Sequence, residues 1–279
     1  MNGKVVVITG GTSGIGQVAA ERLAGMGARV VLVARDKVRA EATLNSLKHI
    51  APGVPPSAYF ADLSKIDAVK QVAREMVAAE PRIDVLINNA GAMFYNRQET
   101  VDGLERTFAT NHMAYFLMTL GLRQSLHAAA PARVVNTSSE AHRRSSLDFD
   151  DLQCKTNYRA FTAYGRSKLC NILFTRELSR RWVGKGVTVN CLHPGFVASR
   201  FGKESGGLLP FVLRAAQLFA ISPEGGAKTL VYLASSPEVA DLSGGYFFKC
   251  RASAPAPQAE DDNAAKRLWQ ESAKLASIE

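Results

Sequence analysis

Residues 4–16 read Lys-Val-Val-Val-Ile-Thr-Gly-Gly-Thr-Ser-Gly-Ile-Gly, an apolar β-branched run followed at once by a glycine-rich turn. A buried parallel strand is expected to be a continuous apolar run, and residues 18–23 after the turn have the apolar spacing of a helix. Glycines at 10, 14 and 16 allow unusual backbone conformations and close approach to the main chain. The helix would direct free N–H groups and its positive dipole end into the turn, which suits a pyrophosphate. The same glycines could instead form only a tight connection.

Strand and helix patterns alternate along the rest of the chain without a break in composition. Further strands are predicted at 28–34, 57–63, 84–89, 133–137, 187–192 and 245–248, and helices at 37–50, 65–79, 102–129, 158–182 and 264–276. This alternation predicts parallel strand pairing through right-handed crossovers. We therefore predict an α/β fold: a Rossmann-type doubly wound parallel sheet of about seven strands with helices on both faces, in a single domain over residues 1–279.

Composition is that of an ordinary globular protein, with 47% apolar and 21% charged residues. The formal charge of +9 would allow an anionic ligand, a nucleic acid or an anionic membrane surface as partner. The basic residues are scattered, so we interpret them as a solvated surface and expect no nucleic-acid partner. Four widely spaced cysteines and five histidines without ligand spacing predict no metal site and no disulfide framework.

The first predicted strand begins within a few residues of Met1, which leaves no room for a signal peptide. No apolar run reaches the ~18–20 residues of a membrane span. We expect a soluble, cytoplasmic protein without an integral membrane segment.

Glycine or polar clusters follow six of the predicted strands. They are Gly10–Gly16, Arg35 with Asp36, Asp62, Asn88–Gly91, Ser138 with Ser139, and His193–Gly195. In a doubly wound sheet, ligands bind outside the carboxyl ends of the strands, near the point where strand order reverses. Each cluster alone could be a turn or a cap, but together they predict one site.

Tyr164-Gly165-Arg166-Ser167-Lys168 falls early in a predicted helix. Residues four apart share a helix face, so the phenol and the ammonium can contact one ligand. An unperturbed tyrosine has a pKa near ~10, and a nearby cation favours the phenolate. The spacing therefore predicts that Lys168 lowers the pKa of Tyr164. The alternative is an ordinary amphipathic helix with a surface Tyr and Lys.

These motifs resemble those of the short-chain dehydrogenase/reductase family over the full length of the chain. Residues 9–16 match its glycine motif, Asn88-Asn89-Ala90-Gly91 its second signature, and Pro194-Gly195 the segment after its sixth strand. The narrower resemblance is to the retinol-dehydrogenase-like branch, through residues 34–36, 111–117, 138–142, 164–175 and 265–269. Animal members of that branch commonly carry an N-terminal membrane anchor, which we do not find in this sequence.

The resemblance implies a catalytic tetrad of Asn111, Ser139, Tyr164 and Lys168. Tyr164 would be the general acid in reduction and the base in oxidation, and Ser139 would donate a hydrogen bond to the substrate oxygen. Lys168 would lower the pKa of Tyr164 and bind the nicotinamide ribose, while Asn111 would keep a water in a proton relay. Asn111 could instead interrupt its helix by bonding back to the main chain.

Cofactor choice depends on the end of the second strand. NAD-using relatives place an acid there, whereas this chain has Ala34 followed by Arg35, which can pair with a 2′-phosphate or simply be an exposed loop residue. We expect NADP, with NAD also usable because Ser13 is not the basic residue that some NADP users carry. Asp62 would contact the adenine amino group. The expected cofactor-binding residues are Gly10, Thr12, Ser13, Gly14, Ile15, Gly16, Arg35, Asp62, Leu63, Asn89, Ala90, Gly91, Tyr164, Lys168, Pro194, Gly195 and Val197.

Residues 196–221 are rich in Gly and Phe and form either a packed helix after a loop or a lid over the substrate. We favour a lid, whose apolar face predicts an apolar substrate. The expected function is NADP(H)-dependent interconversion of an apolar alcohol and its aldehyde or ketone. Two alternatives stay open: reduction of a carbon–carbon double bond, and a redox-sensing regulator that binds nucleotide without turnover. The sequence allows a homo-oligomer.

Overall fold

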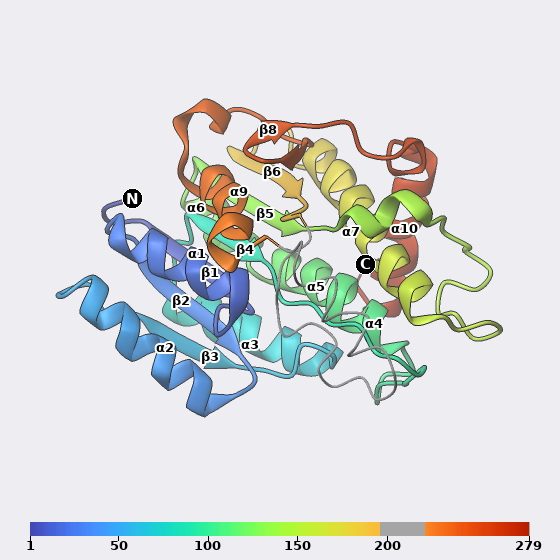
Figure 1. Ribbon diagram of the computed structural model, residues 1–279, viewed down its shortest axis with the longest axis horizontal. Helices are drawn as coiled ribbons and strands as arrows, with labels where there is room; N and C mark the ends of the chain where they lie inside the picture. The colour runs from blue at the N-terminus through green and yellow to red at the C-terminus, as the bar shows by residue number, and fades with distance from the viewer. Residues whose placement is uncertain (196–220, 279) are drawn as a thin grey trace.

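The strands form one eight-stranded sheet in the order β3-β2-β1-β4-β5-β6-β7-β8 (Figure 1). The protein is represented by a computed structural model that describes residues 1–195 and 221–278. Its elements are β1 (Val5–Thr9), α1 (Gly14–Gly25), β2 (Arg29–Ala34), α2 (Lys37–Ile50), β3 (Ser57–Phe60), α3 (Ile66–Ala79), β4 (Val85–Asn88), α4 (Arg106–Phe108), the π-helical turn η1 (Ala109–Met113), α5 (Ala114–Gly121), α6 (Arg123–Ala128), β5 (Ala132–Thr137), the 3₁₀ turn η2 (Glu140–Arg144), α7 (Ala160–Arg181), β6 (Val187–Leu192), α9 (Pro223–Ser235), η4 (Pro237–Val239), β7 (Tyr246–Phe248), β8 (Arg251–Ala252), η5 (Pro257–Ala259) and α10 (Asp262–Leu275).

The strand order reverses at β1, which pairs in parallel with β2 on one side and β4 on the other. Within the described residues, seven strands are parallel, as the sequence predicts, and only the short β8 runs antiparallel, to β7. Two residues are too few to give a periodic signal, so β8 was not expected. Because β1 and β4 end side by side, the glycine turn and Asn88–Gly91 lie at the same edge of the sheet, where ligands bind in this architecture.

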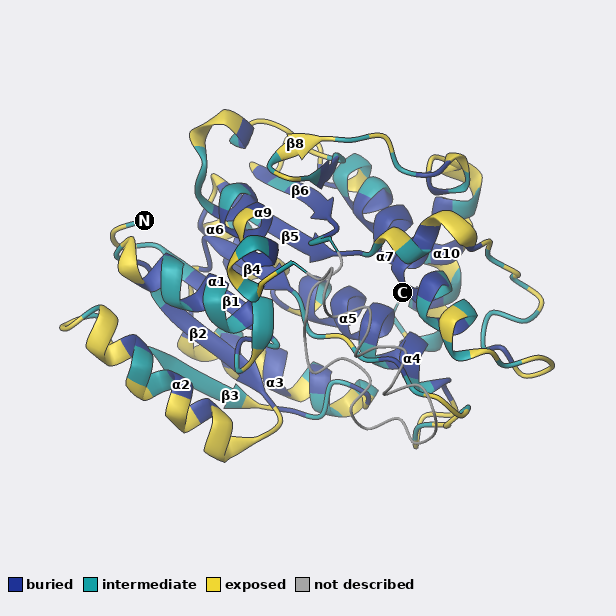
Figure 2. Cartoon of the chain, viewed as in Figure 1, coloured by how far each residue is buried: buried dark blue, intermediate teal, exposed yellow. Residues whose placement is uncertain are grey.

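Both faces of the sheet are covered by helices, which confirms the predicted layering. On one face, α1, α2 and α9 pack on Val6, Ile8 and their neighbours. On the other, α3, α5, α7 and α10 pack on Val7, Leu86 and Val134. Figure 2 shows the central strands buried and the outer surface of α2 exposed. Burial on two faces is the reason why the strands are continuous apolar runs rather than alternating ones.

The helix predicted at 102–129 is divided, and it starts later. The Glu105 carboxylate accepts hydrogen bonds from the N–H groups of Thr107 and Phe108 at 2.7 and 2.8 Å, so helical structure begins after this cap. A π-helical turn then replaces the α-helix at Ala109–Met113. The helix ends at Gly121, and α6 follows after Leu122.

The helix α9 was missed by the sequence prediction. It carries Gly225 and Gly226 in its first turn, and glycine lowers helix propensity by about 1 kcal/mol per residue. Its start signal is present nevertheless: Ser222 accepts the Gly225 N–H at 3.2 Å, and Pro223 follows it at the first helical position. Packing beside α1 stabilises the helix despite the glycines.

None of the helices within residues 1–195 and 221–278 has the length and hydrophobicity needed to cross a membrane. The C-terminal helix α10 lies along α7, where Trp269 packs between Phe116 and Phe174, with ring centroids 5.1 and 6.0 Å apart.

Candidate active site

The glycine turn after β1 is packed too tightly for side chains. Gly10 has a φ of +67°, and a Cβ there would lie 2.8 Å from the Ala90 Cα. A Cβ on Gly16 would lie 2.2 Å from the Gly10 carbonyl oxygen. The turn therefore needs glycine for conformation at one position and for close approach at the other.

The helix α1 begins with its amide donors available. Ser13 is the N-cap residue, but within the described chain its side chain accepts no hydrogen bond from the helix. The N–H groups of Gly14, Ile15 and Gly16 precede the first intrahelical bond, which Gln17 makes to Ser13. Thr12 and Ser13 are the last two residues of the turn before α1. Open amides at the positive end of a helix dipole fit the pyrophosphate of a dinucleotide.

The side chain of Asn89, a residue expected to contact the cofactor, is hydrogen-bonded to the glycine turn. Its side-chain amide donates to the carbonyls of Thr9 and Gly10, both at 3.2 Å. The Thr9 hydroxyl accepts the N–H groups of Asn89 and Ala90 at 2.9 and 3.1 Å. Thr9 was not among the expected site residues, although it is the first residue of the glycine motif. These contacts fix the ends of β1 and β4 to each other.

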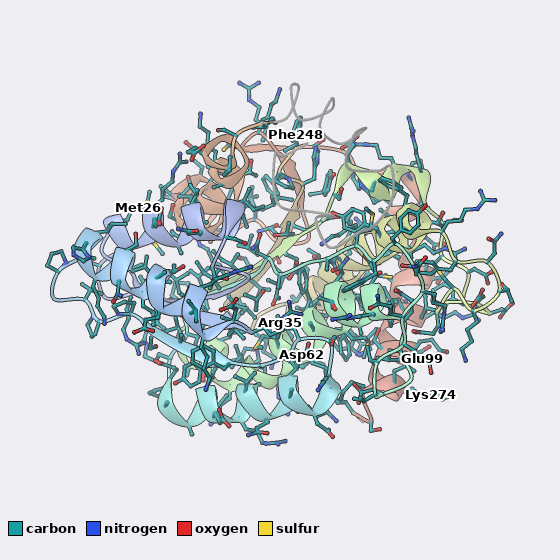
Figure 3. The ribbon with its side chains drawn as sticks, turned by 60° about the horizontal axis from the view of Figure 1, so that its bottom comes forward. Met26, Arg35, Asp62, Glu99, Phe248 and Lys274 are labelled. Carbon is teal, nitrogen blue, oxygen red and sulfur yellow. The ribbon has the colours of Figure 1, made fainter. Side chains whose placement is uncertain are left out.

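Arg35 and Asp62 follow the neighbouring strands β2 and β3 and lie close together in Figure 3. Arg35 is exposed, and no other described residue forms an ion pair with it. Asp62 accepts hydrogen bonds from the N–H and hydroxyl of Ser64 at 3.0 and 2.7 Å. Burial alone would raise the pKa of Asp62, but these bonds and the charges of Lys65 and Arg35 outweigh it, and the pKa is lowered. Leu63, next in sequence, is partly buried.

Tyr164 and Lys168 share one face of α7 at the carboxyl end of β5. The Lys168 Nζ lies 5.6 Å from the ring centroids of both Tyr164 and Tyr115. It donates to the Thr137 carbonyl at 3.2 Å, and the side chain is only 2% exposed. Burial lowers the pKa of Lys168 to about 7. The tyrosine and lysine that the sequence pairs are therefore neighbours, and an exposed amphipathic surface does not describe them.

The pKa of Tyr164 differs from the expectation. Burial raises it to about 12, and a hydrogen bond with Ser139 opposes the rise without cancelling it. The predicted lowering by Lys168 is wrong for this state of the protein. The reason is that removing the phenol from water penalises its charged form, and the hydrogen bond with Ser139 offsets only part of that penalty.

Asn111 lies in the π-helical turn η1 and is fully buried. Its Nδ2 donates to the Ala92 carbonyl and to the Ser167 hydroxyl, each at 2.9 Å, and its Oδ1 accepts the Ala92 N–H at 2.8 Å. These contacts join three segments, so the alternative of bonding back to its own helix is wrong. A Cβ on Gly91 would lie 3.2 Å from the Lys168 Nζ and 3.3 Å from the Asn111 Oδ1, so only a small residue fits between them. Single π-turns occur frequently at functional sites.

Ser139 follows β5 and caps the turn η2. Its hydroxyl oxygen accepts the Ala141 N–H at 3.2 Å, which leaves the hydroxyl proton free to be donated elsewhere. Ser138 has a different role, since its hydroxyl donates to the Lys168 carbonyl at 2.8 Å and is buried. The second serine is therefore the one that faces the site, as the sequence motif indicates.

Pro194 and Gly195 follow His193, the first residue after β6, and are partly buried. Gly195 has a φ of +87°, and a Cβ there would lie 2.5 Å from the Ile221 side chain. Val197 and the lid predicted at 196–221 lie, except for Ile221, outside the described residues. The expected site residues within the described chain thus gather at the carboxyl edge of β1 to β6.

Comparison with known proteins agrees with this arrangement. The short chain dehydrogenase family matches residues 4–206. Human retinol dehydrogenase 13 is 41% identical over 283 residues, covering 99% of this chain and 86% of the relative, and human retinol dehydrogenase 12 is 39% identical over 276 residues, covering 99% and 87%.

Among solved structures, an uncharacterised protein from Mycobacterium paratuberculosis is 31% identical, with a TM-score of 0.80 over 100% of this chain and 95% of the other. The NADP active-site complex of RhlG from Pseudomonas aeruginosa is 28% identical, with a TM-score of 0.71 over 88% of this chain and 94% of the other. The fold, the site and these similarities together show that the chain belongs to the short-chain dehydrogenase/reductase family, in its retinol-dehydrogenase-like branch, as an oxidoreductase that acts on CH–OH groups with NAD(P).

Proposed function

We propose that this protein is an NADP(H)-dependent oxidoreductase that interconverts an apolar alcohol and its aldehyde or ketone, with Tyr164 as the general acid and base. One observation carries the proposal: Tyr164, Lys168 and the Ser139 hydroxyl meet at the end of β5, with Ser139 hydrogen-bonded to Tyr164. A substrate oxygen placed between these side chains would accept a hydrogen bond from Ser139 and a proton from Tyr164.

The residues at the carboxyl edge of the sheet fit a dinucleotide. The open amides of α1 would bind the pyrophosphate, in a turn whose glycines leave no room for a Cβ. The exposed Arg35 would pair with a 2′-phosphate, which favours NADP, and Asp62 would accept a hydrogen bond from the adenine amino group. Lys168 would bind the nicotinamide ribose. When bound, the nicotinamide delivers hydride to the substrate carbon or accepts hydride from it. The NADP complex of RhlG supports the choice of NADP.

Tyr164 donates the proton in reduction and accepts it in oxidation. In reduction, the carbonyl oxygen accepts the Ser139 hydrogen bond and takes the phenol proton of Tyr164, so that the product is a neutral alcohol. A pKa raised to about 12 keeps that proton on Tyr164 at neutral pH, which suits the reducing direction. In oxidation the roles reverse, and the phenolate that accepts the alcohol proton would be stabilised by the Lys168 ammonium.

Two features support an apolar substrate. The retinol dehydrogenases, whose name states an apolar alcohol, are about 40% identical to this chain. Phe161 precedes Tyr164 by three residues on α7, which places both on one helix face, and its 61% exposed ring would be available to an apolar substrate.

Turnover with a panel of substrates tests the proposal. NADPH and NADH oxidation would be followed with long-chain aldehydes and ketones, with short polar aldehydes as matched controls, and with α,β-unsaturated aldehydes whose products are identified. We expect faster turnover with NADPH and apolar aldehydes, and the unsaturated aldehyde converted to the unsaturated alcohol. A saturated aldehyde as product would instead identify a carbon–carbon double-bond reductase. Tight NADPH binding without turnover across the panel would support a redox-sensing regulator.

A further inference from the structure

His142 joins the Ser139 main chain to a distant part of the chain. It is fully buried in η2, three residues after Ser139. Its Nδ1 lies 2.7 Å from the Ser139 carbonyl oxygen, and its Nε2 accepts the N–H of Ala256 at 3.0 Å. A backbone amide can only donate, so Nε2 must be unprotonated and Nδ1 must carry the proton. His142 is therefore a neutral imidazole that donates to Ser139, and burial, which lowers its pKa, agrees with this form.

The distant part is the segment of residues 254–258, which we call the C-terminal strap and which lies between β8 and α10 (Figure 1). Besides the Ala256 contact, the Gln258 Nε2 donates to the carbonyls of His142, Arg143 and Ser145 at 3.3, 3.2 and 2.9 Å. Arg143 in turn donates to the Ala254 carbonyl at 2.8 Å. The strap therefore satisfies the carbonyl groups at the end of η2, and η2 satisfies one carbonyl of the strap.

On its other side, η2 is packed against α7 next to Tyr164. A Cβ on Gly165 would lie 2.1 Å from the Ser145 hydroxyl and 2.8 Å from the Ala141 carbonyl oxygen. The Ser145 hydroxyl donates to that same carbonyl at 3.1 Å. Glycine beside the proposed proton donor thus allows η2 to approach α7 closely. The distance between Ser139 and Tyr164 depends on where η2 lies between α7 and the strap.

The His142 ring itself has little freedom to move. Tyr246 packs edge-on against it with ring centroids 5.2 Å apart, and the Tyr246 hydroxyl is hydrogen-bonded to Nδ1 of His193. His193 lies 3.1 Å from the Glu140 carboxylate at the start of η2. The two histidines and Tyr246 therefore brace η2 from the side of β6 and β7.

We propose that His142 is a positioning residue: its Nδ1–H bond fixes the Ser139 main chain so that the Ser139 hydroxyl meets the substrate oxygen beside Tyr164. The proposal rests on the proposed function, because it assigns His142 an effect through Ser139 and no contact with substrate. The Ser139 hydroxyl already accepts the Ala141 N–H within η2, so movement of η2 would also turn the hydroxyl. A donor misplaced by a fraction of an ångström loses much of its effect on the transition state.

Two substitutions separate the two bonds of His142. His142→Asn places an amide donor near the position of Nδ1 and keeps the bond to Ser139, but it loses the Ala256 bond. His142→Gln reaches the position of Nε2 and keeps an acceptor for Ala256, but it loses the donor to Ser139. We expect kcat to fall about tenfold or more in His142→Gln and to stay within about threefold of wild type in His142→Asn. NADPH affinity and the KM for substrate should change less than about threefold in both variants, because the proposal assigns residue 142 no contact with either molecule.

Equal losses of kcat in the two variants, or an unchanged kcat in His142→Gln, would overturn the positioning role. If His142→Gln fails to fold, His142→Leu is compared with His142→Asn: both lose the Ala256 bond, and leucine has the shape of asparagine without a donor to Ser139, so its kcat should be about tenfold or more below that of His142→Asn at similar NADPH affinity. A kcat for His142→Leu within about threefold of that of His142→Asn would likewise overturn the role. Tyr164→Phe, assayed alongside with the same substrate, distinguishes the failures: an active Tyr164→Phe enzyme refutes the proposed function, whereas an inactive one leaves a failed His142 result to refute only the positioning role.

Discussion

Replacing Lys168 by methionine should stabilise the fold at neutral pH while it removes activity. The ammonium is 2% exposed, and burial lowers the pKa of Lys168 from 10.5 to about 7. Each pKa unit corresponds to about 1.4 kcal/mol, so keeping this charge buried costs on the order of 5 kcal/mol. Methionine keeps the stem of the side chain and has no charge to desolvate. The Thr137 carbonyl keeps a donor in the variant, because the Asn171 side chain also donates to it at 3.1 Å.

The effect should depend on pH with a definite sign. Between about pH 7 and 10.5 the folded protein binds fewer protons at Lys168 than the unfolded chain does, so wild-type stability rises with pH across this window. The full penalty applies below about pH 7 and vanishes above the unfolded pKa. The advantage of Lys168→Met should therefore be at most about 4 kcal/mol at pH 7 and about 1 kcal/mol at pH 9.5.

Urea unfolding at pH 7 and pH 9.5 measures this difference. Lys228→Met is the matched control, since Lys228 is an exposed residue of α9 and its replacement should change stability by less than about 0.5 kcal/mol. We expect Lys168→Met to be more stable than wild type by about 2 kcal/mol or more at pH 7, and by less than half of that at pH 9.5. A variant that is less stable than wild type at pH 7, or a difference that does not change with pH, would refute the reasoning.

Three further predictions concern the cofactor site and the core. Arg35→Ala should weaken NADPH binding about tenfold to a hundredfold and leave NADH binding nearly unchanged, as fluorescence titration would measure; equal losses would remove Arg35 from the phosphate role. Gly16→Ala should weaken both cofactors about tenfold or more by calorimetry, because its Cβ would lie 2.2 Å from the Gly10 carbonyl; unchanged affinity would show that the turn can move freely. Burial lowers the pKa of His112 to about 3, so the folded protein binds fewer protons there than the unfolded chain between pH 3 and 6.5, and stability is lost as pH falls through that range. His112→Gln should show a shallower acid loss in unfolding experiments, and an equally steep one would contradict the argument.

Local sequence patterns predict the strands, helices and turns that form the sheet edge and the site. The continuous apolar run of β1 and the glycine turn after it indicate a buried parallel strand that feeds a helix, and the structure has both. The spacing of Tyr164 and Lys168 predicts a shared helix face, because four residues make about one helical turn. Such features depend on neighbours in sequence, which is why a pattern can reveal them.

Features that depend on distant contacts were not predictable. The π-helical turn around Asn111 has no periodic signal, and its side chain contacts Ala92 and Ser167 on other segments. The contact between Gln258 and η2 joins residues more than a hundred positions apart in the sequence. The raised pKa of Tyr164 has the same origin, because desolvation is set by everything packed around the phenol rather than by the nearest charge.

The central claim is that the Tyr164 hydroxyl transfers the proton, and Tyr164→Phe tests it most directly. Phenylalanine keeps the ring and removes only the hydroxyl, so NADPH binding should stay within about twofold of wild type in a fluorescence titration. NADPH oxidation would be followed in a single turnover with the aldehyde that the wild-type enzyme reduces fastest. A general acid contributes about a hundredfold to ten-thousandfold, so we predict that the rate falls by at least about a hundredfold. A Tyr164→Phe rate above about one tenth of wild type, with NADPH binding intact, would show that another group carries the proton.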